Sequence, residues 1–126
     1  MSTWRREASE RLPELQPLIT SKLVNSPMML WIELNQVFER QCAIEPPPLE
    51  LLKRVWGYCE WCLAHDSDDV RTAAALGFCE HLIDTPKRTE ILPKIMTRSD
   101  FLDLRNLLEY HNTSDEVDAC LKTAWR

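Results

Sequence analysis

The fold of this chain is decided by residues 49–83, whose sequence is LELLKRVWGYCEWCLAHDSDDVRTAAALGFCEHLI. Apolar side chains recur along residues 49–64 at the spacing of one face of an α-helix. In Asp68–Ile83 apolar side chains occur on nearly every side, and a helix of that kind is normally buried among others. The sequence therefore predicts two closely spaced helices, the second of them at the centre of a bundle.

The composition also favours an all-α fold. Only two of the 126 residues are glycine, too few for the many tight turns of a β-rich protein. At this length the chain fits one domain with a substantial core. We therefore predict a single helical domain over residues 1–126. Its architecture is expected to be a compact bundle of about five to seven helices in antiparallel pairs, which can stack as HEAT repeats do.

Further helices are expected on both sides of the central stretch. Ser26 suits an N-cap and Pro27 a first turn, so a helix should begin there and end near Cys42. The remaining expectations are one or two short helices over residues 4–24, broken by Pro13 and Pro17; a segment from Thr85 to about Met96, interrupted at Pro93; a helix capped by Ser99; and a last helix over Ser114–Trp125.

Charge and cysteine content limit the function and location. The 15 Lys and Arg residues face 20 Asp and Glu residues, a formal net charge of −5. Because the basic residues are scattered rather than gathered into a stripe, we expect no nucleic-acid partner. No segment approaches the ~18 apolar residues of a membrane span, so we expect no membrane association. Five cysteines without a signal peptide are expected to stay reduced, which predicts a cytoplasmic location.

The sharpest chemical lead is the spacing Cys59-x-x-Cys62-x-x-His65, with Cys79 and His81 further along the chain. Tetrahedral zinc requires four such ligands around one point. On a helix, however, Cys59 and Cys62 belong to the apolar stripe while His65 projects from another face. We therefore predict buried free thiols. A thiol nucleophile would need a nearby base and an open approach. The sequence predicts no catalytic, metal-binding or cofactor-binding residues and no enzymatic activity.

Glu80 and His81 are predicted to lie on the central helix, where a buried carboxylate and imidazole each need a partner. The simpler interpretation is a structural polar core in which they form hydrogen bonds with neighbouring helices. One alternative is a metal-dependent or thiol enzyme that uses Cys79, Glu80 and His81, with His111 as a further candidate. Another is a structural module that associates with a second copy of itself through an apolar patch on residues 49–64.

A second stripe of larger side chains runs opposite the core stripe of residues 49–64. Tyr, Trp and Arg anchor many protein interfaces, so this stripe either binds a partner or is covered by the terminal helices. The acidic residues that follow it would attract a basic protein. The predicted partner-binding residues are Tyr58, Trp61, His65, Asp66, Asp68 and Asp69.

Several short motifs extend across residues 12–111. They are Leu12-Pro13-Glu14, Met29-Leu30-Trp31-Ile32-Glu33-Leu34, Tyr58-x-x-Trp61-Cys62-Leu63, Phe78-x-Glu80-His81 and Tyr110-His111. In these motifs the chain resembles a family of small all-helical bacterial proteins of uncharacterised function. By analogy of size, charge and helical class, such proteins are similar to immunity proteins that neutralise antibacterial toxins. The resemblance implies a non-catalytic bacterial protein that binds another protein, in the leading interpretation a basic toxin domain.

Overall fold

The computed structural model describes residues 1–126, and its regular structure is entirely helical. The elements, in order, are α1 (Thr3–Arg11), the 3₁₀ turn η1 (Pro13–Leu15), α2 (Gln16–Ile19), α3 (Pro27–Cys42), α4 (Leu49–Leu63), α5 (Asp68–Gly77), the 3₁₀ turn η2 (Cys79–His81), α6 (Pro86–Ile95), α7 (Arg98–Asp103), α8 (Arg105–Leu108) and α9 (Ser114–Ala124). The all-α prediction is confirmed. The predicted five to seven helices are too few, because α2, α7 and α8 are short separate helices.

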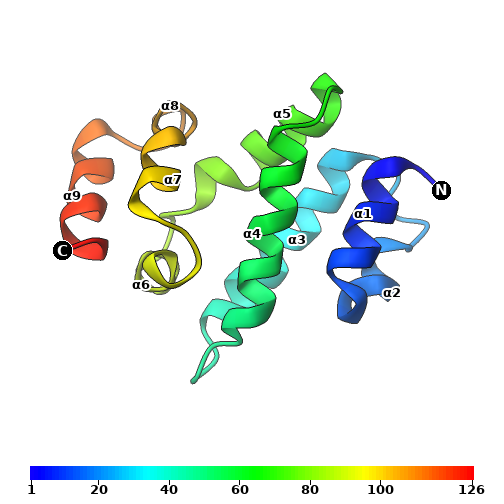
Figure 1. Cartoon of the computed structure of the whole chain (residues 1–126), viewed down its shortest axis with the longest axis horizontal. Coiled ribbons are helices and arrows are strands. Elements are labelled where there is room, and N and C mark those ends of the chain that lie inside the picture. Colours follow the sequence, from blue (N-terminus) through cyan, green and yellow to red (C-terminus); the bar gives the residue numbers. More distant parts are fainter.

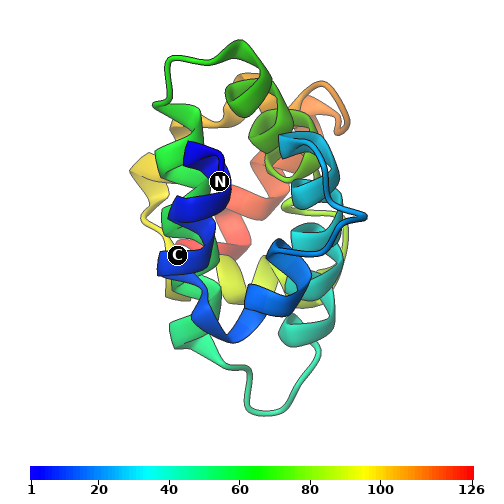
Figure 2. The same cartoon turned by 90° about the vertical axis from the view of Figure 1, so that its right-hand side faces the viewer.

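The helices are arranged in a row along the long axis of the molecule (Figure 1). The α1–α2 pair lies at one end, α3 and α4 follow it, and α6 to α9 form the other end. The two chain termini therefore lie at opposite ends of the row. Seen along this axis, α3 and α4 run antiparallel behind α1 and α2 and are joined by the loop over residues 43–48 (Figure 2).

Side-chain caps fix several helix starts. Ser26 accepts a 3.1 Å hydrogen bond from the backbone N–H of Met29, which confirms the predicted start of α3. The prediction that Ser99 is the N-cap of a helix is wrong. Thr97 and Asp100 form a capping box there, so the N-cap lies two residues earlier, at Thr97, and α7 begins at Arg98. A Thr-x-x-Asp pair satisfies two backbone groups at once, which a lone serine cannot do.

The predicted central helix over Asp68–Ile83 is shorter than expected. It ends at Gly77, because Phe78 leaves the helical conformation with φ −136° and ψ −58°. This break directs the Phe78 ring into the core, 5.0 Å from the ring of Trp31 and 4.9 Å from that of Phe38 between centroids. Since the chain then forms η2, Glu80 and His81 do not lie on a central helix.

The helix α6 differs from its prediction, whereas α9 agrees with it. Pro93 was expected to interrupt its segment, but α6 continues through it. A proline inside a helix lacks one backbone hydrogen bond, yet the burial of Ile91, Leu92 and Ile95 around it outweighs that loss. The last helix agrees with its prediction to within a residue, and its start is fixed by a capping box of Thr113 and Glu116.

The core is continuous along the row of helices, with 31 buried side chains in one hydrophobic cluster. Trp31 of α3 lies near its middle, with its ring stacked on that of Tyr58 from α4 at 5.3 Å. Aromatic contacts of this kind stabilise packing beyond the effect of area alone. No helix has both the length and the apolar content that crossing a bilayer would require.

Gly77 permits the closest approach between α5 and α3. A Cβ atom at this position would lie 2.8 Å from the Cβ atom of Trp31, which cannot rotate away. We expect Gly77→Ala to lower the free energy of unfolding by about 1–3 kcal/mol, although alanine is the better helix former. Urea unfolding followed by tryptophan fluorescence measures this. The half-buried Gly57, whose added Cβ would meet only the end of the Arg11 side chain, is the control, and equal losses at both positions would contradict the explanation.

Candidate functional site

The face of α4 that was predicted to bind a partner is partly covered by α1. Tyr58 is only 1% exposed. Its hydroxyl donates a 2.8 Å hydrogen bond to the carbonyl oxygen of Trp4, and burial raises the pKa of Tyr58 far above its usual value. Tyr58 is therefore a packing residue that a partner cannot reach. At this position the structure shows the alternative in which a terminal helix covers the stripe, since α1 packs on α4 here.

Arg54, one turn before Tyr58 on the same face of α4, binds the N-terminal segment. Its guanidinium donates a 3.0 Å hydrogen bond to the carbonyl oxygen of Arg11 and two 2.6 Å hydrogen bonds to the Glu14 carboxylate. These hydrogen bonds from Arg54 lower the pKa of Glu14 to about 2. The Arg54–Tyr58 half of the predicted face is thus an interface between α4 and the N-terminal segment.

The other half of the face remains partly open. Trp61 and His65 are half-buried, and their rings lie 4.9 Å apart between centroids. The imidazole Nδ1 of His65 accepts a 3.0 Å hydrogen bond from the backbone N–H of Ser67, which shapes the loop before α5. Trp61 and His65 therefore present a partly accessible edge of α4 beside this loop.

The loop before α5 and the first turn of α5 present the predicted acidic residues to solvent. Asp66, Asp68 and Asp69 are all exposed. Arg71 pairs with Asp68 and donates hydrogen bonds to the carbonyl oxygens of His65 and Asp66, of 2.7 and 2.8 Å. The loop is thus held by Arg71, while the carboxylates of Asp66 and Asp69 have no ion-pair partner.

A second group of carboxylates lines a groove between α4 and α7. We call it the acidic groove; it has a volume of about 260 Å³ and is lined by Trp56, Glu60, Leu63, Ala64, Asp100, Asp103 and Leu104. None of its three carboxylates takes part in any of the ion pairs of the structure. Partial burial, and then the nearby Asp100, raise the pKa of Glu60. The groove combines an apolar floor with three carboxylates that form no ion pair.

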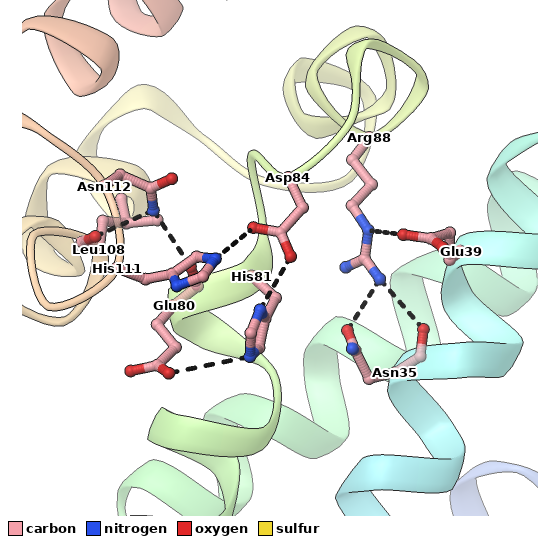
Figure 3. A network of polar contacts seen from close by, with 9 residues as sticks. All are labelled: Asn35, Glu39, Glu80, His81, Asp84, Arg88, Leu108, His111 and Asn112. Atoms are coloured by element: carbon pink, nitrogen blue, oxygen red, sulfur yellow. Dashed lines mark hydrogen bonds and ion pairs between the residues drawn. The ribbon is translucent and has the colours of Figure 1, made fainter.

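Glu80 and His81, the predicted polar core, lie half-buried near the surface. Together with Asp84 and His111 they form a polar network between η2 and the segment after α8 (Figure 3). The His81 Nδ1 atom lies 2.8 Å from one Asp84 carboxylate oxygen, and the His111 Nε2 atom lies 3.3 Å from the other. The Glu80 carboxylate is 3.7 Å from His81 Nε2. Asp84 was not among the predicted site residues.

Asn112 fixes the two segments that carry this network. Its side-chain amide donates hydrogen bonds of 3.1 Å to the carbonyl oxygen of Glu80 and 2.9 Å to that of Leu108. The imidazole rings of His81 and His111 consequently meet edge to face, with centroids 4.8 Å apart. The spacing of His81 and Asp84, three residues apart, is visible in the sequence, but His111 joins them only through the fold.

The chain matches no protein-family model, no curated protein and no solved structure. The resemblance to small bacterial proteins and to immunity proteins therefore stays a prediction.

The five cysteines are free and buried, as expected for structural thiols. Cys79 is fully buried, and its sulfur lies 3.4 Å from that of Cys59. Burial, followed by the neighbouring Cys79 thiol, raises the pKa of Cys59 well above its usual value. Neither sulfur is open to a substrate, which weighs against a thiol enzyme.

An exposed apolar patch lies away from all of these groups. Leu23 is 79% exposed, and Met29 and Ile32 on α3 are also exposed. Leu23 and Met29 also line a groove of about 450 Å³ that is formed by α2, the loop between α2 and α3, and the first part of α3. The self-association alternative would need an apolar patch on residues 49–64, but no large apolar side chain is exposed there.

Proposed function

We propose that this protein is a non-catalytic, cytoplasmic helical domain that binds a basic protein, and that it acts as an immunity-type inhibitor of a bacterial toxin. The observation that carries the proposal is the acidic groove, in which Glu60, Asp100 and Asp103 line an apolar floor and form no ion pair with any side chain. A lysine or arginine side chain fits such a groove, because its aliphatic stem packs on apolar atoms while its charge meets carboxylates.

The surrounding charge supports the same partner. The net charge is −5, and the exposed Asp66, Asp68 and Asp69 lie on the loop that follows α4 and in the first turn of α5, beyond the helix that forms one wall of the acidic groove. Such a field accelerates the approach of a basic protein and disfavours acidic competitors. Trp61 and His65 add a partly exposed aromatic edge of the kind that anchors interfaces. The row of helix pairs also supports HEAT-like stacking, an architecture that often serves as a binding scaffold.

Self-association is the second candidate. It is favoured by the exposed side chains of Leu23, Met29 and Ile32, since contiguous apolar surface often marks an interface. In that case the partner would be a second copy of the chain, and association would depend on protein concentration rather than on salt.

Reversing the charge of the acidic groove is expected to abolish partner binding. Tagged wild-type protein should capture one basic protein at one-to-one stoichiometry from the native lysate. The double variant Glu60→Lys and Asp103→Lys should retain at least about tenfold less of it, because charges that attracted the partner now repel it. Mass spectrometry and band densities of the eluates measure this, and capture by the wild type should weaken as salt is raised.

The matched control reverses two exposed carboxylates outside the groove that have no ion-pair partner. Glu10→Lys with Asp115→Lys changes the net charge by the same amount and should leave capture close to that of the wild type. Equal capture by both double variants would contradict binding through the groove. If light scattering shows a dimer and the eluate holds only this chain, self-association replaces the inhibitor proposal.

A further inference from the structure

The side chains of His81, Asp84 and His111 converge from two segments that are distant in sequence. Each offers one potential ligand atom, and these atoms all lie within 4.8 Å of one another. Two nitrogen or oxygen atoms bound to the same tetrahedral zinc ion are about 3.4 Å apart, as follows from metal–ligand distances of about 2.0–2.2 Å. The His111 Nε2 and Asp84 oxygen atoms are already 3.3 Å apart. Side-chain rotations that bring the widest separation, at most 4.8 Å, to this spacing and lengthen the 2.8 Å separation of His81 and Asp84 would place all three around one ion.

We propose that His81, Asp84 and His111 form a binding site for a divalent transition-metal cation. Two imidazoles and a carboxylate suit Zn²⁺ and similar first-row ions, whereas Mg²⁺ and Ca²⁺ prefer shells built of oxygen. The Glu80 carboxylate, 3.7 Å from His81 Nε2, lies on the side of the His81 ring away from Asp84, where it can orient the imidazole while Nδ1 binds the ion (Figure 3).

The site is held in shape before any ion arrives. Asn112 links the backbone of η2, which carries Glu80 and His81, to the end of α8, just before His111. Preorganisation of this kind lowers the cost of binding, because the ligand-bearing segments need not be ordered by the metal. The Asp84 carboxylate faces both rings, so it can bind an ion and orient the imidazoles around it.

The cluster is also accessible. The side chains of His81 and Asp84 are each 27% exposed, and that of His111 is 48% exposed. A hydrated cation can therefore enter from solvent without local unfolding. The proposal is independent of the acidic groove, which is built from α4 and α7, and a failure of either proposal leaves the other standing.

The test is a titration of the untagged protein with Zn²⁺ by calorimetry and with Co²⁺ by visible absorption, since a polyhistidine tag would bind both ions. The wild type should bind one ion per chain, and the Co²⁺ complex should show the intense bands of a low-symmetry site with nitrogen ligands. His111→Ala and Asp84→Asn should each weaken binding by at least about 100-fold, because each removes a direct ligand.

The third histidine provides the matched control. His65 is half-buried like His81 but lies beside Trp61, and His65→Ala should bind as the wild type does. Asn112→Ala should weaken binding by about tenfold through lost positioning. Absence of saturable binding by the wild type, or an equal loss in His65→Ala, would overturn the proposal. If a variant fails to fold by circular dichroism, the wild-type Co²⁺ spectrum decides: that of the hydrated ion alone overturns the site, and the intense bands support it.

Discussion

Raising the pH from 8 to 11 is expected to lower the free energy of unfolding by about 4 kcal/mol. Burial raises the pKa values of Cys42 and Cys62 from 9.0 to about 11. The unfolded chain therefore loses these protons at a lower pH than the folded protein does. The stabilising contribution is complete below pH 9 and disappears as the pH rises toward 11. Each thiol accounts for about 2 kcal/mol of the loss at pH 11.

Two further buried groups, Cys59 and Tyr58, also make the folded protein less stable at high pH. Burial also raises the pKa values of Cys59 and Tyr58, so ionisation of these groups in the unfolded chain favours unfolding further. Small domains are stable by only about 5–15 kcal/mol, and a loss of this size is a large part of that margin. Urea unfolding in a reducing buffer at pH 8, 9.5 and 11, followed by tryptophan fluorescence, measures it.

The control removes the two titrating thiols. A Cys42→Ala and Cys62→Ala double variant should be less stable at pH 8, because it leaves small cavities, but its stability should fall less steeply between pH 9 and 11. An unfolding midpoint that stays constant up to pH 11 in the wild type would show that these thiols do not govern alkaline stability.

The helices that the sequence predicted well are those with local signals. Ser26 and Pro27 mark the start of α3, and the apolar stripe of residues 49–64 corresponds to α4, Leu49–Leu63. Capping and periodicity depend on neighbours a few residues apart, so they are visible without the fold. The break after Gly77 was missed because its cause is tertiary: Phe78 turns out of the helix to pack against Trp31.

The candidate sites depend on contacts that no local pattern contains. Glu60 and Asp103 are 43 residues apart, and they line one groove only because α7 packs beside α4. His111 likewise reaches Asp84 across 27 residues. The sequence identified His81 as a residue needing a partner but assigned it to a buried helix. Because the helix ends at Gly77, His81 lies half-buried in η2 and not, as predicted, on a buried helix.

Arg88 was overlooked at the sequence level, although it is the one charged residue in the core, with 1% exposure. Its guanidinium donates a 3.2 Å hydrogen bond to the Glu39 carboxylate and hydrogen bonds of 3.1 and 2.8 Å to the backbone and side-chain oxygens of Asn35 (Figure 3). It also lies 5.3 Å above the Phe38 ring. These contacts join the start of α6 to α3, and their loss should be costly.

Arg88→Ala is accordingly expected to lower the free energy of unfolding by about 3–5 kcal/mol. The substitution leaves a cavity against Phe38 and removes the donors for both oxygens of Asn35. Arg88→Met should cost only about 1–2 kcal/mol, since it fills the same space and Glu39, which is largely exposed, can turn to water. Thermal and urea unfolding distinguish the two variants.

The comparison separates packing from hydrogen bonding at this position. If methionine costs as much as alanine, the hydrogen bonds to Asn35 dominate and the volume of the arginine stem contributes little. If alanine costs less than about 1 kcal/mol, the contacts of Arg88 do not join α6 to α3 and the explanation fails. Arg40, an exposed α3 residue that forms no ion pair, is the matched control, and Arg40→Ala should change stability by no more than about 0.5 kcal/mol.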